Sequence, residues 1–354
     1  MQEKTSLILE NGSVVQAACP VIVSASRSTD IPAFYTDWFF HRLKAGYSVW
    51  TNPFNGLKSY VSYAKTRFIV FWSKNPLPLL PYLDTLREKN IGCYIQYTLN
   101  DYEAEGLESG VPPLERRIDT FLKLSAYLGK QAVIWRFDPL ILTDSVSVEL
   151  LLEKIRYIGD RLAGFTEKMV FSYADIGSYR KVTANLQKSG ISYKEWTEEL
   201  MVDFASRLAK MNKMRSWNFT LATCGEKIDH SRYGIIHNSC IDGKLIIRLA
   251  YRDKKLLDYL RVKILKPFGN DLFNEQSIPA DAELLPDGSY FLYSHHKDTG
   301  QRRQCGCATS KDIGEYNTCP HLCEYCYANS SKHIAVENWN RHQKNRFAET
   351  ITGL

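Results

Sequence analysis

The sequence predicts an α/β fold, and a TIM-like β/α barrel, partial or full, is the first interpretation. Short apolar runs rich in β-branched and aromatic residues alternate along the chain with longer stretches of helical periodicity. Six such units can be distinguished in residues 1–224, and polar residues follow the end of each predicted strand. A doubly wound open sheet is the alternative fold for the same pattern.

Each predicted element has a local reason. The apolar runs predict strands at 21–25, 68–72, 93–99, 132–137, 169–173 and 219–222, and a seventh strand at 313–316. Helical periodicity predicts helices at 79–89, 114–128, 146–162, 196–211 and 336–347. Asp30 precedes Ile31-Pro32, and its carboxylate is suited to accept hydrogen bonds from the first amides of another helix.

Length and composition predict an ordinary globular chain with three parts. The 354 residues are 44% hydrophobic, which is ample for a buried core. We expect a β/α barrel body over 1–224, an insertion with auxiliary cysteines over 225–310, and a final strand, cysteine loop and helix over 311–354. The formal net charge of +6 permits a nucleic-acid partner but does not require one.

The location of the protein is expected to be cytoplasmic, with no membrane partner. No apolar run of membrane-spanning length occurs in the sequence, and residues 1–20 lack the pattern of an export signal. The nine cysteines are therefore expected to be reduced, so that clusters of them indicate metal binding rather than disulfides. Cys19 and Cys93 lie beside or within apolar strand patterns and are expected to be plain core residues.

The polar strand ends supply candidate substrate contacts. Active sites of β/α barrels lie where the strands end, so these residues are expected to gather around one rim. Lys74, Asn100, Arg136 and Asp138 would form a mixed polar pocket suited to a zwitterion, a sugar or a base. Any single polar strand end is equally well explained as a turn or a helix cap.

The most informative motif is Cys319-Pro-His-Leu-Cys323-Glu-Tyr-Cys326, near the end of the chain. Three thiolates form an incomplete cage for a four-iron cluster and leave one iron open to an outside ligand. An open iron indicates chemistry rather than a structural role.

This spacing, Cys-x3-Cys-x-Tyr-Cys, resembles the cluster motif of the radical S-adenosylmethionine (SAM) superfamily, and Asn317-Thr318-Cys319 resembles the end of that superfamily's first barrel strand. The whole chain resembles an uncharacterised bacterial family with such a cluster near its C-terminus. The resemblance implies a [4Fe-4S] cluster, reductive cleavage of SAM to a 5′-deoxyadenosyl radical, and hydrogen abstraction from a substrate that the sequence does not identify. It also implies an electron donor such as flavodoxin or ferredoxin, and contact of Tyr325 with the adenine of SAM.

The position of the motif implies a circular permutation. In most members of the superfamily the cysteines lie near the N-terminus, whereas here only 28 residues follow Cys326. The strand before the cysteine loop would then pair with the strand at 21–25, and the cluster would lie above Ser26 and Arg27, with Arg27 able to approach a carboxylate. The Gly-Gly-Glu segment that usually holds the amino group of SAM does not occur in this chain.

Four further cysteines predict a second site. Cys305-Gly-Cys307 precedes the main motif, and Cys224 and Cys240 lie in nearby stretches of the sequence. Four thiolates would complete a closed cage for a second [4Fe-4S] cluster or for zinc. The alternative is that Cys224 and Cys240 are small buried hydrophobic residues.

Two alternatives to this interpretation stay open. Zinc bound by cysteine and histidine would involve His321, while His295-His296 look like solvated loop residues. Such a protein would be a non-catalytic iron–sulfur or zinc protein that senses redox state or binds nucleic acid. Alternatively, the motif is also similar to that of spore photoproduct lyase, a radical SAM enzyme acting on DNA, and the basic loop 297–303 would then contact phosphates.

Overall fold

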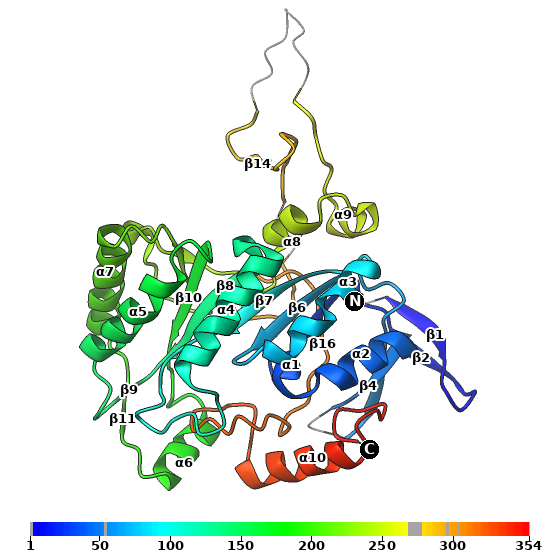
Figure 1. The fold of residues 1–354 in the computed structure, drawn as a ribbon, viewed down its shortest axis with the longest axis horizontal. Helices are drawn as coiled ribbons and strands as arrows, with labels where there is room; N and C mark the ends of the chain where they lie inside the picture. Colours follow the sequence, from blue (N-terminus) through cyan, green and yellow to red (C-terminus); the bar gives the residue numbers. More distant parts are fainter. Residues whose placement is uncertain (1–2, 53–54, 268–277, 295–296, 303–304, 354) are drawn as a thin grey trace, which may run out of the picture.

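The structure is a computed structural model that describes residues 3–52, 55–267, 278–294, 297–302 and 305–353. Its centre is an eight-stranded sheet in which every pairing is parallel, with the order β13-β12-β10-β8-β7-β6-β3-β16 (Figure 1). The strands are β3 (Ile22–Ala25), β6 (Phe68–Ser73), β7 (Gly92–Thr98), β8 (Val133–Leu140), β10 (Lys168–Tyr173), β12 (Thr220–Thr223), β13 (Ile236–His237) and β16 (Lys311–Asp312). The predicted α/β class is confirmed.

The six strands predicted before residue 225 are all present, but the seventh was predicted at the wrong position. The last strand comprises Lys311–Asp312, and residues 313–316 form a loop. Asp312 accepts a hydrogen bond on Oδ1 from the Gly314 amide at 3.0 Å, a side-chain turn that bends the chain away from the sheet. A Cβ at Gly314 would overlap Ser26 Oγ, so the chain can turn this closely only at a glycine.

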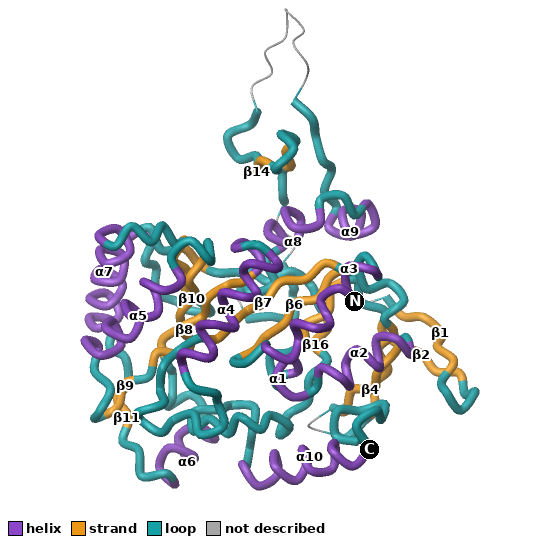
Figure 2. The backbone as a smooth tube through the Cα atoms, in the orientation of Figure 1, coloured by secondary structure: helices purple, strands orange, loops and turns teal. Residues whose placement is uncertain are grey.

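Helices cover both faces of the sheet unequally. One face shares an apolar cluster with seven helices: α1 (Ile31–Phe34), α2 (Thr36–Ala45), α3 (Leu83–Glu88), α4 (Leu114–Leu128), α5 (Val148–Leu162), α6 (Arg180–Lys188) and α7 (Glu198–Met214). The other face packs against α8 (Gly243–Ala250) and α9 (Lys254–Leu260). In Figure 2, α8 and α9 project on the side of the sheet away from α10 (Lys332–Lys344). None of the helices in the described part of the chain is long and apolar enough to cross a membrane.

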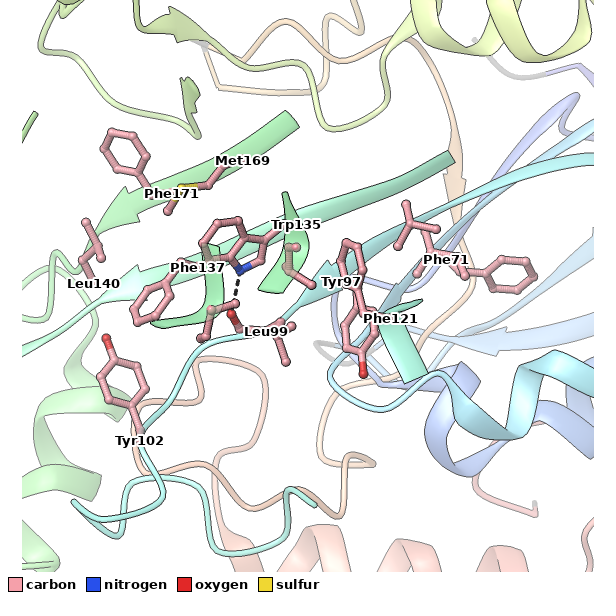
Figure 3. Packing of buried hydrophobic residues seen from close by; sticks show 14 of the residues in the cluster. Phe71, Tyr97, Leu99, Tyr102, Phe121, Trp135, Phe137, Leu140, Met169 and Phe171 are labelled. Carbon is pink, nitrogen blue, oxygen red and sulfur yellow. Dashed lines mark hydrogen bonds between the residues drawn. The ribbon is translucent and has the colours of Figure 1, made fainter. Parts of the chain in front are cut away.

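The core between the sheet and α4 is built from aromatic side chains (Figure 3). Tyr97 stacks on Phe121 of α4 with ring centroids 5.3 Å apart. Trp135 is fully buried, and its indole nitrogen donates to the Leu99 carbonyl at 2.8 Å. A buried indole N–H needs such a partner, so this bond fixes the end of β7 against β8.

Helix boundaries follow their capping residues. The helix predicted at 114–128 is confirmed residue for residue. Asp30 caps α1 as predicted, because its carboxylate accepts from the Ala33 amide at 3.0 Å. The helix predicted from residue 79 begins later, at Leu83, because a proline-containing 3-10 helix, η1 (Leu77–Tyr82), precedes it. Those predicted from 146, 196 and 336 begin at 148, 198 and 332.

A second sheet was missed by the sequence analysis. It contains β1 (Lys4–Ile8), β2 (Val14–Ala18), β5 (Lys58–Ser62) and β4 (Tyr47–Thr51), in that spatial order. The chain after α10 packs against it, since the Val49 amide donates to the Glu349 carbonyl at 2.8 Å. Strand β4 and the segment after α10, far apart in the sequence, are therefore neighbours in the fold.

The remaining elements are short. Strands β9 (Leu142–Thr143) and β11 (Tyr193–Lys194) form one pair, and β14 (Glu283–Leu284) and β15 (Tyr290–Phe291) form another. The second pair is an antiparallel hairpin that turns around Asp287-Gly288. Single turns of 3-10 helix occur at η2 (Lys130–Ala132) and η3 (Ser231–Tyr233).

Candidate functional site

The cysteine loop leaves the sheet next to β3. Strand β16 pairs in parallel with β3, with Lys311 opposite Val23 and Asp312 opposite Ser24. The expected pairing of the last strand with the strand at 21–25 is therefore confirmed. Thr29 then donates to the Glu315 carbonyl at 2.8 Å, which ties the beginning of the loop to the segment after β3.

Cys319, Cys323 and Cys326 lie on this loop and are buried or half-buried. Burial raises the pKa of all three thiols, that of Cys319 to about 12, and nearby thiolate charges of the same loop add to the effect at Cys319 and Cys323. Backbone amides act in the opposite direction at Cys319 and Cys326. Three buried sulfurs that repel one another as thiolates need a positively charged partner, and a [4Fe-4S] cluster fits this donor set.

A buried polar network lies against the loop. Lys74 Nζ is 2.7 Å from Glu108 Oε1, 3.2 Å from Asn100 Oδ1 and 3.0 Å from the Tyr325 hydroxyl. The Tyr325 hydroxyl donates to Glu108. Burial favours the neutral form of Glu108, but Lys74 and Arg117 outweigh it and hold the pKa of this carboxyl below its ordinary value. Tyr325 therefore links the cysteine loop to two of the predicted substrate residues.

Ser26 and Arg27 follow β3 and lie beside the beginning of the cysteine loop. Ser26 is buried, with its hydroxyl 3.3 Å from that of Ser28. The backbone of Arg27 belongs to the cysteine loop region, because its amide donates to Asp312 at 2.9 Å and its carbonyl accepts from the Tyr327 hydroxyl at 2.6 Å. Its side chain is half-buried over the Trp72 ring, with the guanidinium carbon 5.5 Å from the centroid.

The pKa of the Arg27 guanidinium is affected by the second group of cysteines, Cys224, Cys240, Cys305 and Cys307, which we call the four-cysteine group. Burial works against the guanidinium, but Cys307, Asp312 and Cys240 together raise its pKa. This side chain therefore faces the four-cysteine group and Asp312, while its backbone contacts the three-cysteine loop.

The four remaining predicted ligands meet from three segments of the chain. These ligands are the members of the four-cysteine group, Cys224, Cys240, Cys305 and Cys307. Sγ of Cys224 lies 3.1 Å from Sγ of Cys240, and the thiol of Cys307 is close enough to those of Cys240 and Cys305 to lower the pKa of both. The proximity of Cys307 lowers the pKa of the Cys305 thiol to about 6. The sequence-based grouping is thus found in the structure.

Arg136 and Asp138 belong to this group rather than to the cysteine loop. Arg136 Nη1 is 3.3 Å from Cys240 Sγ, its Nη2 donates to Asp138, and its guanidinium carbon lies 5.2 Å from the centre of the Trp72 ring. Asp138 also accepts from Ser172. The four predicted substrate residues therefore form two sets: Lys74 and Asn100 at the three-cysteine loop, and Arg136 and Asp138 at the four-cysteine group.

Binding of a metal by histidine has less support than binding by the cysteines. His321 Nε2 is 2.8 Å from Asp30 Oδ2 and its Nδ1 is 3.0 Å from the Gly110 carbonyl, so both ring nitrogens already have partners. His295-His296 and Arg303 of the basic loop lie outside the described residues. Across the described ranges, no set of three or more His, Cys, Asp or Glu side chains is arranged, as it stands, around one metal ion.

Several site residues were not identified from the sequence. Glu108 lies in an irregular stretch before α4, and Trp72 was counted only as part of an apolar strand. Glu226 follows β12, and burial together with Asp138 and Asp175 raises the pKa of its carboxyl to about 7. Its place in the polar segment that follows a predicted strand was the available signal for Glu226, whereas Glu108 has no comparable signal.

Comparison with known proteins identifies a family to which the chain is similar. A family model described as a domain of unknown function (DUF1848) matches residues 22–328. No curated protein and no solved structure matches the chain.

Proposed function

This chain belongs to the family of the domain of unknown function DUF1848, and from the residues of this member we propose that it is a radical SAM enzyme. In this proposal Cys319, Cys323 and Cys326 hold a [4Fe-4S] cluster with one iron left open. When bound, the cluster and SAM supply the one-electron chemistry that releases a 5′-deoxyadenosyl radical. A reduced flavodoxin-like or ferredoxin-like protein is the expected electron donor.

One observation carries the proposal. The loop with the three cysteines follows β16 after six intervening residues, and β16 enters the parallel sheet beside β3 rather than beside a strand close to it in sequence. This is the place that the resemblance requires for a cysteine loop at the end of a first strand. A surface metal loop would not require a partner strand 288 residues away.

The same topology supports a permuted, partial β/α barrel. From β3 to β13 the strands follow one another across the sheet in chain order, without the reversal that defines a doubly wound sheet. The helices α1 to α7 share one apolar cluster with a single face of the sheet. In an open doubly wound sheet, successive helices would cover both faces.

The residues of the chain have separate tasks in this proposal. Three thiolates bind iron, and backbone amides near Cys319 and Cys326 stabilise their negative charge. Lys74, paired with Glu108 and in contact with Tyr325, fixes the position of that ring beside the loop. The buried setting limits access of water to a reactive intermediate.

The proposal is tested by anaerobic reconstitution with iron and sulfide. Electron paramagnetic resonance of the reduced protein is recorded with and without SAM, and 5′-deoxyadenosine is measured afterwards. We expect a cubane signal that changes when SAM is added. Cys323→Ala should abolish both the signal and the product, whereas Cys93→Ala, which changes a half-buried cysteine packed against the core, should retain them.

Either of two results would contradict the proposal. A cluster whose signal is indifferent to SAM would favour a redox-sensing iron–sulfur protein. Loss of the native fold in Cys323→Ala, with Cys93→Ala still folded, would favour a structural metal in the loop.

A further inference from the structure

The two cysteine groups differ in how closely their sulfurs lie. Within the described residues, no hydrogen bond joins the thiols of Cys319, Cys323 and Cys326 to one another. In the four-cysteine group, Sγ of Cys224 and Sγ of Cys240 are in direct contact, 3.1 Å apart. The two groups are therefore suited to metal centres of different size.

We propose that Cys224, Cys240, Cys305 and Cys307 form a second, closed metal site that holds one zinc ion in a tetrahedron of four thiolates. This site is separate from the three-cysteine loop and does not depend on the radical SAM proposal. It joins the end of β12, the segment before α8, and residues 305–307.

Geometry favours a single ion over a second cube. Zinc–sulfur bonds of about 2.3 Å in a tetrahedron place the sulfurs roughly 3.8 Å apart. The pair at 3.1 Å would have to separate by less than about 1 Å when zinc replaces the thiol protons. In a four-iron cube each thiolate binds a different iron, so sulfurs in direct contact would have to separate much further.

Donors already point at these sulfurs. The Ile241 amide is 3.3 Å from Cys307 Sγ, and Asn238 Nδ2 and Arg136 Nη1 are each 3.3 Å from Cys240 Sγ. Metal-bound thiolates are commonly held and tuned by such surrounding hydrogen bonds. Four thiols buried only as hydrophobic residues would not need three donors directed at two of them.

The charges around the group suit a negative centre. Zinc binding releases four thiol protons and forms four zinc–sulfur bonds without electron transfer, so the centre carries a net charge of about −2. Cys240 and Cys307 are only 5% and 2% exposed, and a buried negative centre needs nearby cations. Arg27 and Arg136 provide two, and each also has a carboxylate neighbour, Asp312 or Asp138.

The test is the metal content of the full chain, with zinc and iron measured in the same anaerobic preparation. We expect about one zinc per chain in the unmodified protein and at least roughly tenfold less in Cys240→Ser. Cys93→Ser, a matched cysteine outside the group, should retain zinc. Cys323→Ser should lose iron and retain zinc, which separates this site from the cluster of the proposed function.

Zinc retained in Cys240→Ser would overturn the assignment, as would iron and sulfide bound by the four-cysteine group in Cys323→Ser. If Cys240→Ser does not fold, a second measurement on the unmodified chain tests the zinc site instead. Cobalt exchanged into the site should give the intense absorption of a tetrahedral thiolate complex, and its absence would also overturn the proposal. A protein that binds zinc but has no SAM-responsive cluster would contradict the proposed function and leave the zinc site supported.

Discussion

The buried ion pair between Lys74 and Glu108 gives a prediction whose size follows from the structure. The two side chains are 14% and 1% exposed, with Nζ and Oε1 2.7 Å apart. Removing one member of a buried pair costs about 3–5 kcal/mol, because the other charge stays buried without its partner. Glu108→Gln keeps an oxygen for Tyr325 and Lys74, so we expect the lower end, about 3 kcal/mol, or roughly a hundredfold in the unfolding equilibrium constant.

The pH dependence of this loss has a definite sign. The pKa of Glu108 is lower in the folded protein than its ordinary value, so the unfolded chain takes up the proton first as the pH falls. The stabilisation by the carboxylate is therefore present above the unfolded pKa, about 4.3, and is lost as the pH falls through the lower, folded pKa. The gap between wild type and Glu108→Gln should be full at pH 7 and shrink below about pH 4.

Urea unfolding at several pH values measures this gap. The matched control is Glu149→Gln. Glu149, like Glu108, forms an ion pair, here with Arg207 at 3.0 Å, but the side chain of Glu149 is 70% exposed. Exposed pairs contribute little, so the control should unfold like the wild type. An equal loss in both variants, or a gap that persists unchanged at acid pH, would refute the reasoning.

Three further predictions follow from other residues. Ser147→Ala should lower the free energy of unfolding by about 1 kcal/mol in a urea titration, because Ser147 caps α5 through the Leu150 amide, and Ser147→Gly should cost only a few tenths. Gly314→Ala should reduce iron binding by the cysteine loop, measured by colorimetric iron assay, because its Cβ would overlap Ser26; normal iron content would show that the turn can move. Glu226→Gln should stabilise the protein more at pH 8 than at pH 5 in thermal unfolding, because burial raises the pKa of Glu226 to about 7 and the cost of its ionisation grows from the unfolded pKa, about 4.3, up to that value; equal melting shifts at both pH values would contradict this.

Local patterns explain which parts of the fold could be predicted. Helix α4 was predicted exactly because Pro113 precedes its periodic stretch and Gly129 ends it. The two-stranded hairpin of β1 and β2 was missed because its residues are largely exposed and carry no long apolar run. The last strand was misplaced because the Asp312 turn depends on a contact with the chain near Ser26, which no local window contains.

In the candidate site, too, the residues that could be predicted are those with a local sequence pattern. The three cysteines of the loop were identifiable because their spacing is local. The four-cysteine group could be proposed by count, but the contact between Cys224 and Cys240 depends on the packing of two separate segments. The network of Lys74, Glu108 and Tyr325 was beyond prediction, because its members are 34 and 251 residues apart in sequence.

The pairing of β16 with β3 has a consequence for how the protein is made. A ribosome synthesises β3 and its neighbours long before Lys311–Asp312, so the edge of β3 emerges without its final partner. Until then that edge offers unpaired backbone groups to other chains. Strand β16 and the cysteine loop are translated one directly after the other, so this edge of the sheet is covered at the stage of synthesis at which the three cysteines emerge.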